Sequence, residues 1–432
     1  TVYYSGSISK TSSSGSITPS IFGIRLSDGA FKSGEVCYKL NNAIGSTVFY
    51  QSINSNYYPT FNSNEWKVLY NSSQTPSYYN NIPSFNNTIS SYADLITFRN
   101  LVNSGTTYEN QTITLLSDID ITGDEWIPIG TATSPFNGVF DGQNHKISNF
   151  KCYANNHLNQ VGLFGNATNE IKNLTIENVF IGEQINTNQE SDFGSLLGCL
   201  TRNVNINNKS SINYCYANNC KILIYEFNRD YIFNVGGLVG NVTRSNIAFC
   251  GIKNGVIDIY GGSYIGGLIG WGNDTGGTIY NSFSEVDITF QMADTNFECI
   301  LGGLCCDNFI TEYCYSINTI KVTNLTDGKV NGLNSSGICN NCHVTTNIDV
   351  EINNLYNYAI SINGLCGHFN EVSQYNYIDA TIAYNILKQK GVIKVSLNAE
   401  DSTYSYNYAV NDRITNKGTI TPTYTYKGTP YN

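Results

Sequence analysis

The chain has 432 residues, of which 23 are Lys or Arg and 33 are Asp or Glu, giving a formal net charge of −10. Such an acidic chain is not expected to bind nucleic acid, because phosphate recognition needs a basic surface. The hydrophobic fraction of 41%, with 13% aromatic residues, argues against an intrinsically disordered chain. No apolar run approaches the roughly 18 residues that a membrane-spanning helix needs, so no membrane-spanning segment is predicted.

Residues 1–80 are predicted to form a small N-terminal β module with its linker. The linker is indicated by residues 71–90, which are rich in Asn, Ser, Tyr and Pro and have the composition of irregular connections. Residues 81–400 carry an internal repeat and are predicted to form one solenoid. Residues 401–432 are predicted to be an extended segment rich in Tyr and Thr.

Short blocks of Gly and Leu mark the repeat. The leucines of successive blocks are separated by 29 to 42 residues. A period near 30 residues with variable insertions is typical of a solenoid. The anchoring leucines are Leu163, Leu196, Leu238, Leu268, Leu304, Leu333 and Leu365.

Two further strand-like pieces complete each repeat. Residues 212–216 and 247–250 represent the first piece, and residues 256–259 and 320–322 represent the second. Both pieces alternate with the period of two that is typical of strands, and no sustained helical period competes. Three short strands in about 30 residues make one coil, so the fold class is predicted to be all-β, a parallel and right-handed β-helix.

A column of small side chains is predicted inside the coils. Stacked coils place equivalent residues about 4.8 Å apart, and Cys behaves there as a small buried hydrophobe. Disulfides between neighbouring coils and a metal or redox stack are the alternatives, although the odd total of 13 Cys leaves at least one thiol unpaired within the chain. The proposed column is Leu174, Cys215, Cys250, Ser282, Cys314, Cys342 and Asn376.

These repeats resemble the GLUG-repeat family of bacterial-type surface proteins. The resemblance rests on Gly-Gly-Leu-x-Gly blocks at residues 236–240 and 266–270, followed by strands of the Ile-x-x-Cys-Tyr kind. A lead-in between Tyr92 and Ile147 is also similar, and in the family such a segment forms the first coils. The resemblance covers roughly residues 85–390, and residues 334–336 depart from its pattern. It implies a β-solenoid displayed at the cell surface in adhesin-like or stalk-like proteins, without a shared activity.

The chain is predicted not to be an enzyme, with no catalytic residue and no cofactor. None of its four His residues lies near a nucleophile signature; they are His145, His157, His343 and His368. One compact acidic cluster is present, formed by Asp118, Asp120, Asp124 and Glu125.

Asp118 and Asp120 are weak candidates for a calcium site, and no other metal is predicted. The two carboxylates alternate with isoleucines and so point to one face of a strand. Calcium needs six or more oxygen ligands, and this pair of carboxylates supplies only part of that number. A solvated strand face, or a pair of catalytic carboxylates acting on a polysaccharide, are the alternatives.

Ten Asn-x-Ser/Thr sequons are candidates for N-glycosylation if the chain passes through a eukaryotic secretory system. Because the chain is rich in Asn, Ser and Thr, about this number is expected by chance. The sequons lie at Asn71, Asn86, Asn110, Asn166, Asn173, Asn208, Asn241, Asn273, Asn324 and Asn334.

Taken together, these patterns favour an extracellular structural or adhesive surface protein. Both ends of the chain are rich in Tyr, which suits contact surfaces, and residues 15–20 are echoed by residues 418–423. Matching ends suit a head-to-tail contact between copies of the chain, which builds filaments. Expected partners are copies of itself, other surface proteins and glycans. The alternative function is a carbohydrate-active enzyme or a glycan-binding protein on the same scaffold.

Overall fold

The computed structural model divides the chain into two compact units, Thr1–Thr106 and Thr107–Asn432. Each unit is described by itself. The structure describes residues 3–4, 24–25, 36–37, 40–41, 48–51, 59–61, 85–121, 125–154, 160–183, 191–200, 210–225, 232–273, 277–292, 298–306, 309–356, 358–368, 374–397, 408–409 and 413–426.

The described residues of the first unit include short strands and a helix at residues 92–103. Strands β1 (Tyr3–Tyr4) and β2 (Ile24–Arg25) pair in parallel, and Tyr50 forms an antiparallel bridge with Thr60. Strand β3 (Thr88–Ile89) precedes helix α3 (Tyr92–Asn103).

The expectation that the segment beginning at Tyr92 forms a first coil is therefore wrong for residues 92–103. Ser91 caps the helix, because its side chain accepts a hydrogen bond from the backbone N–H of Asp94. Leu95, Phe98 and Val102 are buried at helical spacing. A cap followed by this spacing favours a helix over a strand.

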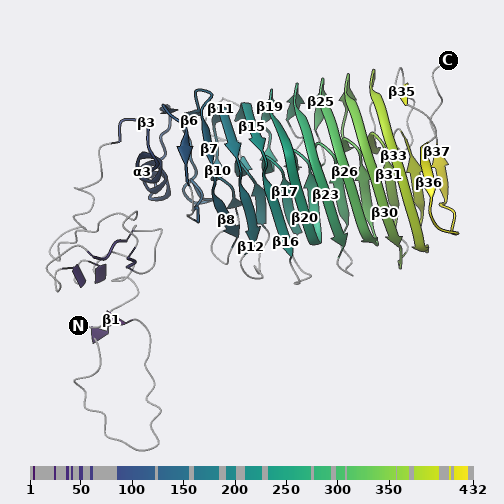
Figure 1. Cartoon of the computed structure of the whole chain (residues 1–432), viewed down its shortest axis with the longest axis horizontal. Coiled ribbons are helices and arrows are strands. Elements are labelled where there is room, and N and C mark those ends of the chain that lie inside the picture. The colour runs from purple at the N-terminus through teal and green to yellow at the C-terminus, as the bar shows by residue number, and fades with distance from the viewer. Residues whose placement is uncertain are drawn as a thin grey trace, which may run out of the picture. The chain divides into compact units, whose positions relative to one another are not determined.

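The second unit is a parallel β-solenoid, as the repeat predicts (Figure 1). Each coil begins on a face built from β4 (Thr112–Leu115), β5 (Ile119–Asp120), β6 (Val139–Asp141), β7 (Lys146–Ser148), β11 (Glu170–Glu177), β15 (Ser211–Asn218), β19 (Asn246–Ala248), β22 (Thr278–Tyr280), β25 (Ile310–Glu312) and β29 (Cys339–Asn340). The coils continue through β8 (Lys151–Ala154), β12 (Phe180–Glu183), β16 (Lys221–Tyr225), β20 (Gly251–Gly266), β23 (Phe283–Met292), β26 (Tyr315–Leu325), β30 (His343–Asn353), β33 (Tyr377–Lys388), β35 (Tyr408–Ala409) and β36 (Ile414–Asn416).

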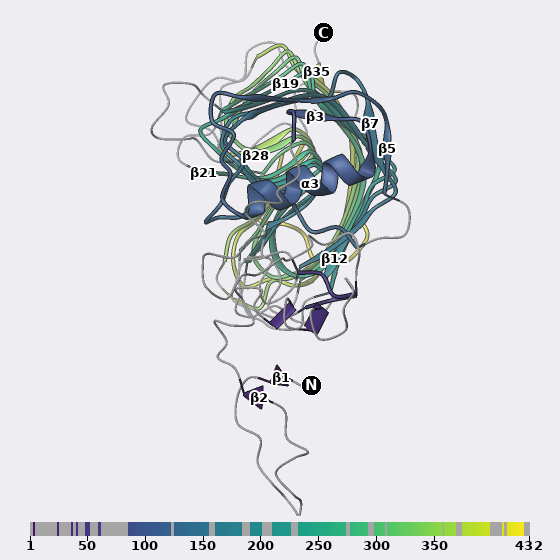
Figure 2. The same ribbon diagram turned by 90° about the vertical axis from the view of Figure 1, so that its left-hand side faces the viewer.

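Two more sets of strands close each coil around the core. One set is β9 (Gln160–Val161), β13 (Ser191–Gly194), β17 (Ile232–Gly236), the second half of β20 (residues 262–266), β24 (Cys299–Gly302), β27 (Gly328–Asn331), β31 (Ile360–Asn363), β34 (Ile393–Ser396) and β37 (Tyr424–Tyr426). The other set is β10 (Phe164–Ala167), β14 (Leu197–Leu200), β18 (Val239–Thr243), β21 (Ile269–Asn273), β28 (Asn334–Ser336) and β32 (Cys366–His368). Seen from the end, the successive coils of this unit overlie one another (Figure 2).

The Gly-Leu blocks form the tight turns between the last two sets. Their leucines are fully buried, and from Leu196 to Leu333 each leucine N–H donates to the leucine carbonyl of the next coil, as Leu268 does to Leu304 at 2.7 Å. A Cβ atom added to Gly267 would overlap the carbonyl oxygen of Gly303, and one on Gly303 would overlap that of Gly332. Glycine is therefore required because successive coils approach each other at their backbones.

The core is filled by the inward side chains of alternating strands. In β23, Val286, Ile288 and Phe290 are buried, whereas Asp287 and Thr289 between them face solvent. The register places Ile288 beside Ile320 of β26, and the column continues through Ile348 and Ile382. Full burial of one such side chain is worth about 1.5–3 kcal/mol, so each coil adds its own share of stabilisation.

The described residues between 408 and 426 continue the same ladder. β35 and β36 pair in parallel with β33, and β37 pairs in parallel with β34. Ile414 lies beside Ile382 in the isoleucine column, but Ile382 is fully buried and Ile414 is only half-buried. The isoleucine column is therefore partly exposed at the last coil that the structure describes.

Candidate functional site

The small side chains proposed for the inner column are buried and follow one another from coil to coil. Cys215, Cys250, Ser282, Cys314 and Cys342 each expose at most 2% of their surface. The backbone N–H of Cys250 donates to Ser282 Oγ at 3.1 Å, and that of Cys215 donates to Cys250 Sγ at 3.5 Å. Each side chain thus accepts a backbone hydrogen bond from the preceding coil, and burial raises the pKa of the thiols of Cys215 and Cys314.

The residue before each member of the inner column lies at a bend and points outward. We call this set the bend column; its φ angles lie between 45° and 57°, in the left-handed region. Tyr214, Tyr313 and Tyr375 in it expose 47%, 53% and 56% of their surface. Asn tolerates this backbone conformation, whereas it costs an aromatic residue about 1–2 kcal/mol. The bend column is Asn173, Tyr214, Phe249, Asn281, Tyr313, Asn341 and Tyr375.

Aromatic rings of the bend column stack on each other along the solenoid. The rings of Tyr214 and Phe249 are parallel, with centroids 4.7 Å apart. Tyr280 packs edge-on against both Phe249 and Tyr313, at centroid distances of 5.8 and 5.5 Å. These distances lie in the range in which aromatic pairs attract. The rings therefore form one aromatic surface from Tyr214 to Tyr313.

A second aromatic column lies two residues further along each strand. Phe283 and Tyr315 are neighbours in register, and their rings are parallel at 4.9 Å. His343 and Tyr377 continue the column with ring centroids 4.7 Å apart. Gly251 leaves room for the Phe283 ring, since a Cβ at Gly251 would overlap it. The two columns together give one face of the solenoid an aromatic character that the Gly-Leu repeats do not reveal.

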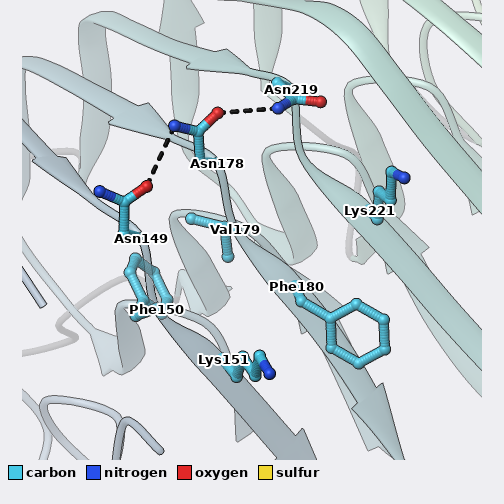
Figure 3. A pocket seen from close by; sticks show the side chains of 8 residues that line it. All are labelled: Asn149, Phe150, Lys151, Asn178, Val179, Phe180, Asn219 and Lys221. Carbon is cyan, nitrogen blue, oxygen red and sulfur yellow. Dashed lines mark hydrogen bonds between the residues drawn. The ribbon is translucent and has the colours of Figure 1, made fainter. Parts of the chain in front are cut away.

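A different column of left-handed residues, the asparagine ladder, lies at another corner (Figure 3). Asn178 donates to Asn149 Oδ1 at 3.0 Å, and Asn219 donates to Asn178 Oδ1 at 2.7 Å. The ladder borders an open groove of about 350 Å³ with Lys151, Phe180 and Lys221 on its other side. The amides satisfy one another, so the ladder mainly holds the corners in register.

The carboxylates considered for calcium lie on a solvated strand face. Ile119 and Ile121 are buried on either side of the exposed Asp120, which agrees with the predicted alternation. Asp118 accepts hydrogen bonds from the backbone N–H of Lys146 at 3.1 Å and pairs with His145 Nδ1 at 3.0 Å. These two contacts, with the Lys146 N–H first, hold the pKa of Asp118 below its usual value.

Lys146 connects this surface network to a third carboxylate, Glu177. Lys146 Nζ lies 3.0 Å from Glu177 Oε2, and Asn218 donates to Glu177 Oε1 at 3.2 Å. Both contacts lower the pKa of Glu177. In the part of the chain that the structure describes, no three His, Cys, Asp or Glu side chains converge as metal ligands do. Asp124 and His157 lie outside the described residues.

The sequons differ in accessibility. Asn86 and Asn110 are exposed, and Asn173, Asn241 and Asn324 are half-buried. Asn166 and Asn334 are buried, and Asn334 donates its amide to the carbonyl oxygen of Phe309 at 3.0 Å, so a glycan on Asn334 is incompatible with the folded coil. Asn71, Asn208 and the side chain of Asn273 are outside the described residues.

Comparison with known proteins adds little to this geometry. The sequence matches no protein-family model and no curated protein. Among solved structures, the chain is similar to a Bacteroides ovatus protein named a "putative immunoglobulin A1 protease", with a TM-score of 0.42, 18% identity, and coverage of 75% of this chain and 84% of that chain. A likeness of this size carries no argument about activity. Within the described residues, no helix is long and apolar enough to span a bilayer.

Proposed function

We propose that the protein is an extracellular structural and adhesive surface protein without catalytic activity. In this proposal the solenoid is a rigid rod that assembles head to tail into filaments, and its repeats are of the GLUG kind. The Gly-Leu turns support the repeat type, and the exposed aromatic columns support an adhesive surface, because aromatic residues are enriched in contact surfaces. The single observation that carries the assembly is the partial exposure of Ile414, in the last coil that the structure describes.

An open coil end is suited to pairing with another chain. β36 and β37 present the last strand edges among the described residues, and unpaired edges are templates for further pairing. Ile414 adds a half-buried apolar side chain to that edge. A contact between this end and the opposite end of a second copy is heterologous, and such contacts build filaments unless a rotation closes them. Residues 418–423 lie in this last coil, whereas their echo at residues 15–20 lies outside the described residues.

The test compares two charge substitutions at neighbouring positions. Ile414→Lys places an ammonium group on the open end of the core, whereas Thr415→Lys places it on the exposed outer face. Sedimentation and negative-stain microscopy are expected to show filaments or oligomers for the intact chain and for Thr415→Lys, and monomers for Ile414→Lys.

Deleting residues 404–432 provides an independent variant of the same test. We expect the truncated chain to lose assembly because it lacks the last coil. An intact chain that stays monomeric at high concentration, as the truncated chain does, would show that the end is capped within one molecule and would refute the assembly.

A further inference from the structure

Among the described residues, the bend column contains one interruption that no aromatic side chain fills. Asn281 and Asn341 both replace an aromatic residue in the column. At Asn281, the ring of Tyr280 occupies the space between Phe249 and Tyr313. The residues equivalent to Tyr280 on the next two coils are Glu312 and Asn340. The residue before Asn341 therefore has an amide where Tyr280 has a ring.

The space left between Tyr313 and Tyr375 is a groove of about 290 Å³, which we call the tyrosine slot. Its lining consists of Glu312, Tyr313, Asn340, Asn341, Gln374 and Tyr375. The two tyrosines are separated by two coils, which corresponds to about 9–10 Å at the strand spacing of a sheet. A ring placed midway would lie about 5 Å from each tyrosine, within the distance at which rings stack. The slot therefore admits one six-membered ring.

The polar groups of the slot indicate which kind of ring fits. The Glu312 carboxylate and the amides of Asn340, Asn341 and Gln374 offer hydrogen-bond acceptors and donors beside the two aromatic walls. A pyranose carries C–H groups on its faces and hydroxyl groups around its edge, so it can contact rings and polar groups at once. A plain aromatic ring has no hydroxyl groups to satisfy these polar side chains, and an anionic sugar would be repelled by Glu312.

The geometry points to the tyrosine slot as a binding site for one neutral pyranose residue of a glycan. This inference deepens the adhesive part of the proposed function by naming its ligand class, and it does not depend on filament assembly. Tyr313 and Tyr375 hold the sugar between them, and Glu312 with the neighbouring amides selects its hydroxyl pattern.

The test uses the full chain carrying Ile414→Lys, so that binding is measured whether or not filaments form. The probes are the methyl glycosides of glucose, galactose, mannose, N-acetylglucosamine, fucose and xylose, followed by saturation-transfer NMR. We expect at least one probe to bind in the millimolar range. Tyr375→Ala is expected to weaken that binding by about tenfold or more, whereas Tyr214→Ala, in the same column but outside the slot, leaves it unchanged.

Asn341→Tyr is the sharpest variant, because it fills the slot at a backbone strain that three tyrosines of the same column already carry. Asn341 has a φ of 54°, and Tyr214, Tyr313 and Tyr375 adopt φ angles of 54° to 57° in the same column. This variant is expected to fold and to lose sugar binding. Glu312→Gln is expected to retain the neutral probe and to admit methyl glucuronide.

Three outcomes would overturn the inference: no signal from any of the six neutral probes, binding of methyl glucuronide alone by the Ile414→Lys chain, or equal effects of Tyr375→Ala and Tyr214→Ala. An intact chain that forms no filaments but still binds the sugar would refute only the assembly.

Discussion

Two surface columns of the solenoid use the same backbone conformation with different results. In the asparagine ladder, Asn178 lies between two further asparagines and is hydrogen-bonded to both. In the bend column, asparagines and aromatic residues alternate irregularly, and only some neighbours can stack. Both columns consist of left-handed residues, but the asparagine ladder is hydrogen-bonded from Asn149 to Asn219, whereas the bend column leaves the tyrosine slot.

The difference shows how a repeat protein can gain a site without a new element. When identical side chains stack, each one contacts a partner about 4.8 Å away. Such a regular column leaves no space for a ligand between its side chains. A single mismatch, such as Asn341 between two tyrosines, opens a space whose size is set by the coil spacing. Binding sites in such a fold are therefore expected where columns are irregular.

The largest effect is expected from breaking the asparagine ladder at its centre. Asn178→Val removes both amide hydrogen bonds and places a β-branched residue at a φ of 55°, for a loss of about 2–4 kcal/mol in unfolding free energy. Asn178→Gly removes the same bonds without backbone strain and should lose about 1 kcal/mol. Chemical denaturation followed by circular dichroism measures both, and equal losses would contradict a strained left-handed position.

The inner column provides the next comparison. Cys250→Ala deprives the backbone N–H of Cys215 of its acceptor, which should lower the unfolding free energy by about 1–3 kcal/mol. Cys250→Ser should lower it by less than about 1 kcal/mol, because Ser282 already fills the same role for Cys250. A serine variant as unstable as the alanine variant would show that the hydrogen bond is unimportant.

Carboxylates on neighbouring coils repel each other and should lower the stability of the fold, whereas stacked amides raise it. Burial, and then the charge of Glu298 on the preceding coil, raise the pKa of Asp327 to about 6. Because the folded chain then binds a proton more tightly than the unfolded chain, this group makes stability rise as pH falls from about 6 to about 4.

Asp327→Asn should remove that pH dependence. At pH 7 it should stabilise the fold by about 1–2 kcal/mol, a value reduced for the partial exposure of the side chain. Thermal unfolding at pH 4.5 and pH 7 checks it, and an Asp327→Asn variant with an unchanged pH profile would contradict the assignment. Glu298→Gln should give a smaller shift in the same direction.

The smallest effect is expected at the regular end of the bend column. Tyr214→Ala removes the parallel ring contact with Phe249, at a cost of about 0.5–1.5 kcal/mol. Tyr214→Phe keeps the ring and should be neutral in thermal unfolding. If the alanine variant is also neutral, the stacked rings do not contribute to the stability of the fold.

Most of the solenoid could be predicted from the sequence because the same constraint recurs in every coil. The Gly-Leu turns and alternating strands carry that signal, and helix α3 was missed although Ser91 and Asp94 mark its start. The bend column had a readable signal, since Tyr, Phe or Asn stands before each member of the inner column from Cys215 onward. The tyrosine slot could not be predicted, because it depends on the register that puts Asn340 where Tyr280 lies two coils earlier.

The reactivity of the buried thiols can be used to measure local opening of the solenoid. Burial raises the pKa of Cys152 to about 12 and that of Cys220 to about 11, so each is almost wholly protonated at neutral pH and unreactive toward alkylating reagents and oxidants. A thiol becomes reactive only when its coil separates from its neighbours. Labelling the thiols for increasing times and analysing the chain by mass spectrometry would therefore give an opening rate for each coil that contains a cysteine. Coils that open rarely would keep their thiols reduced even outside the cell.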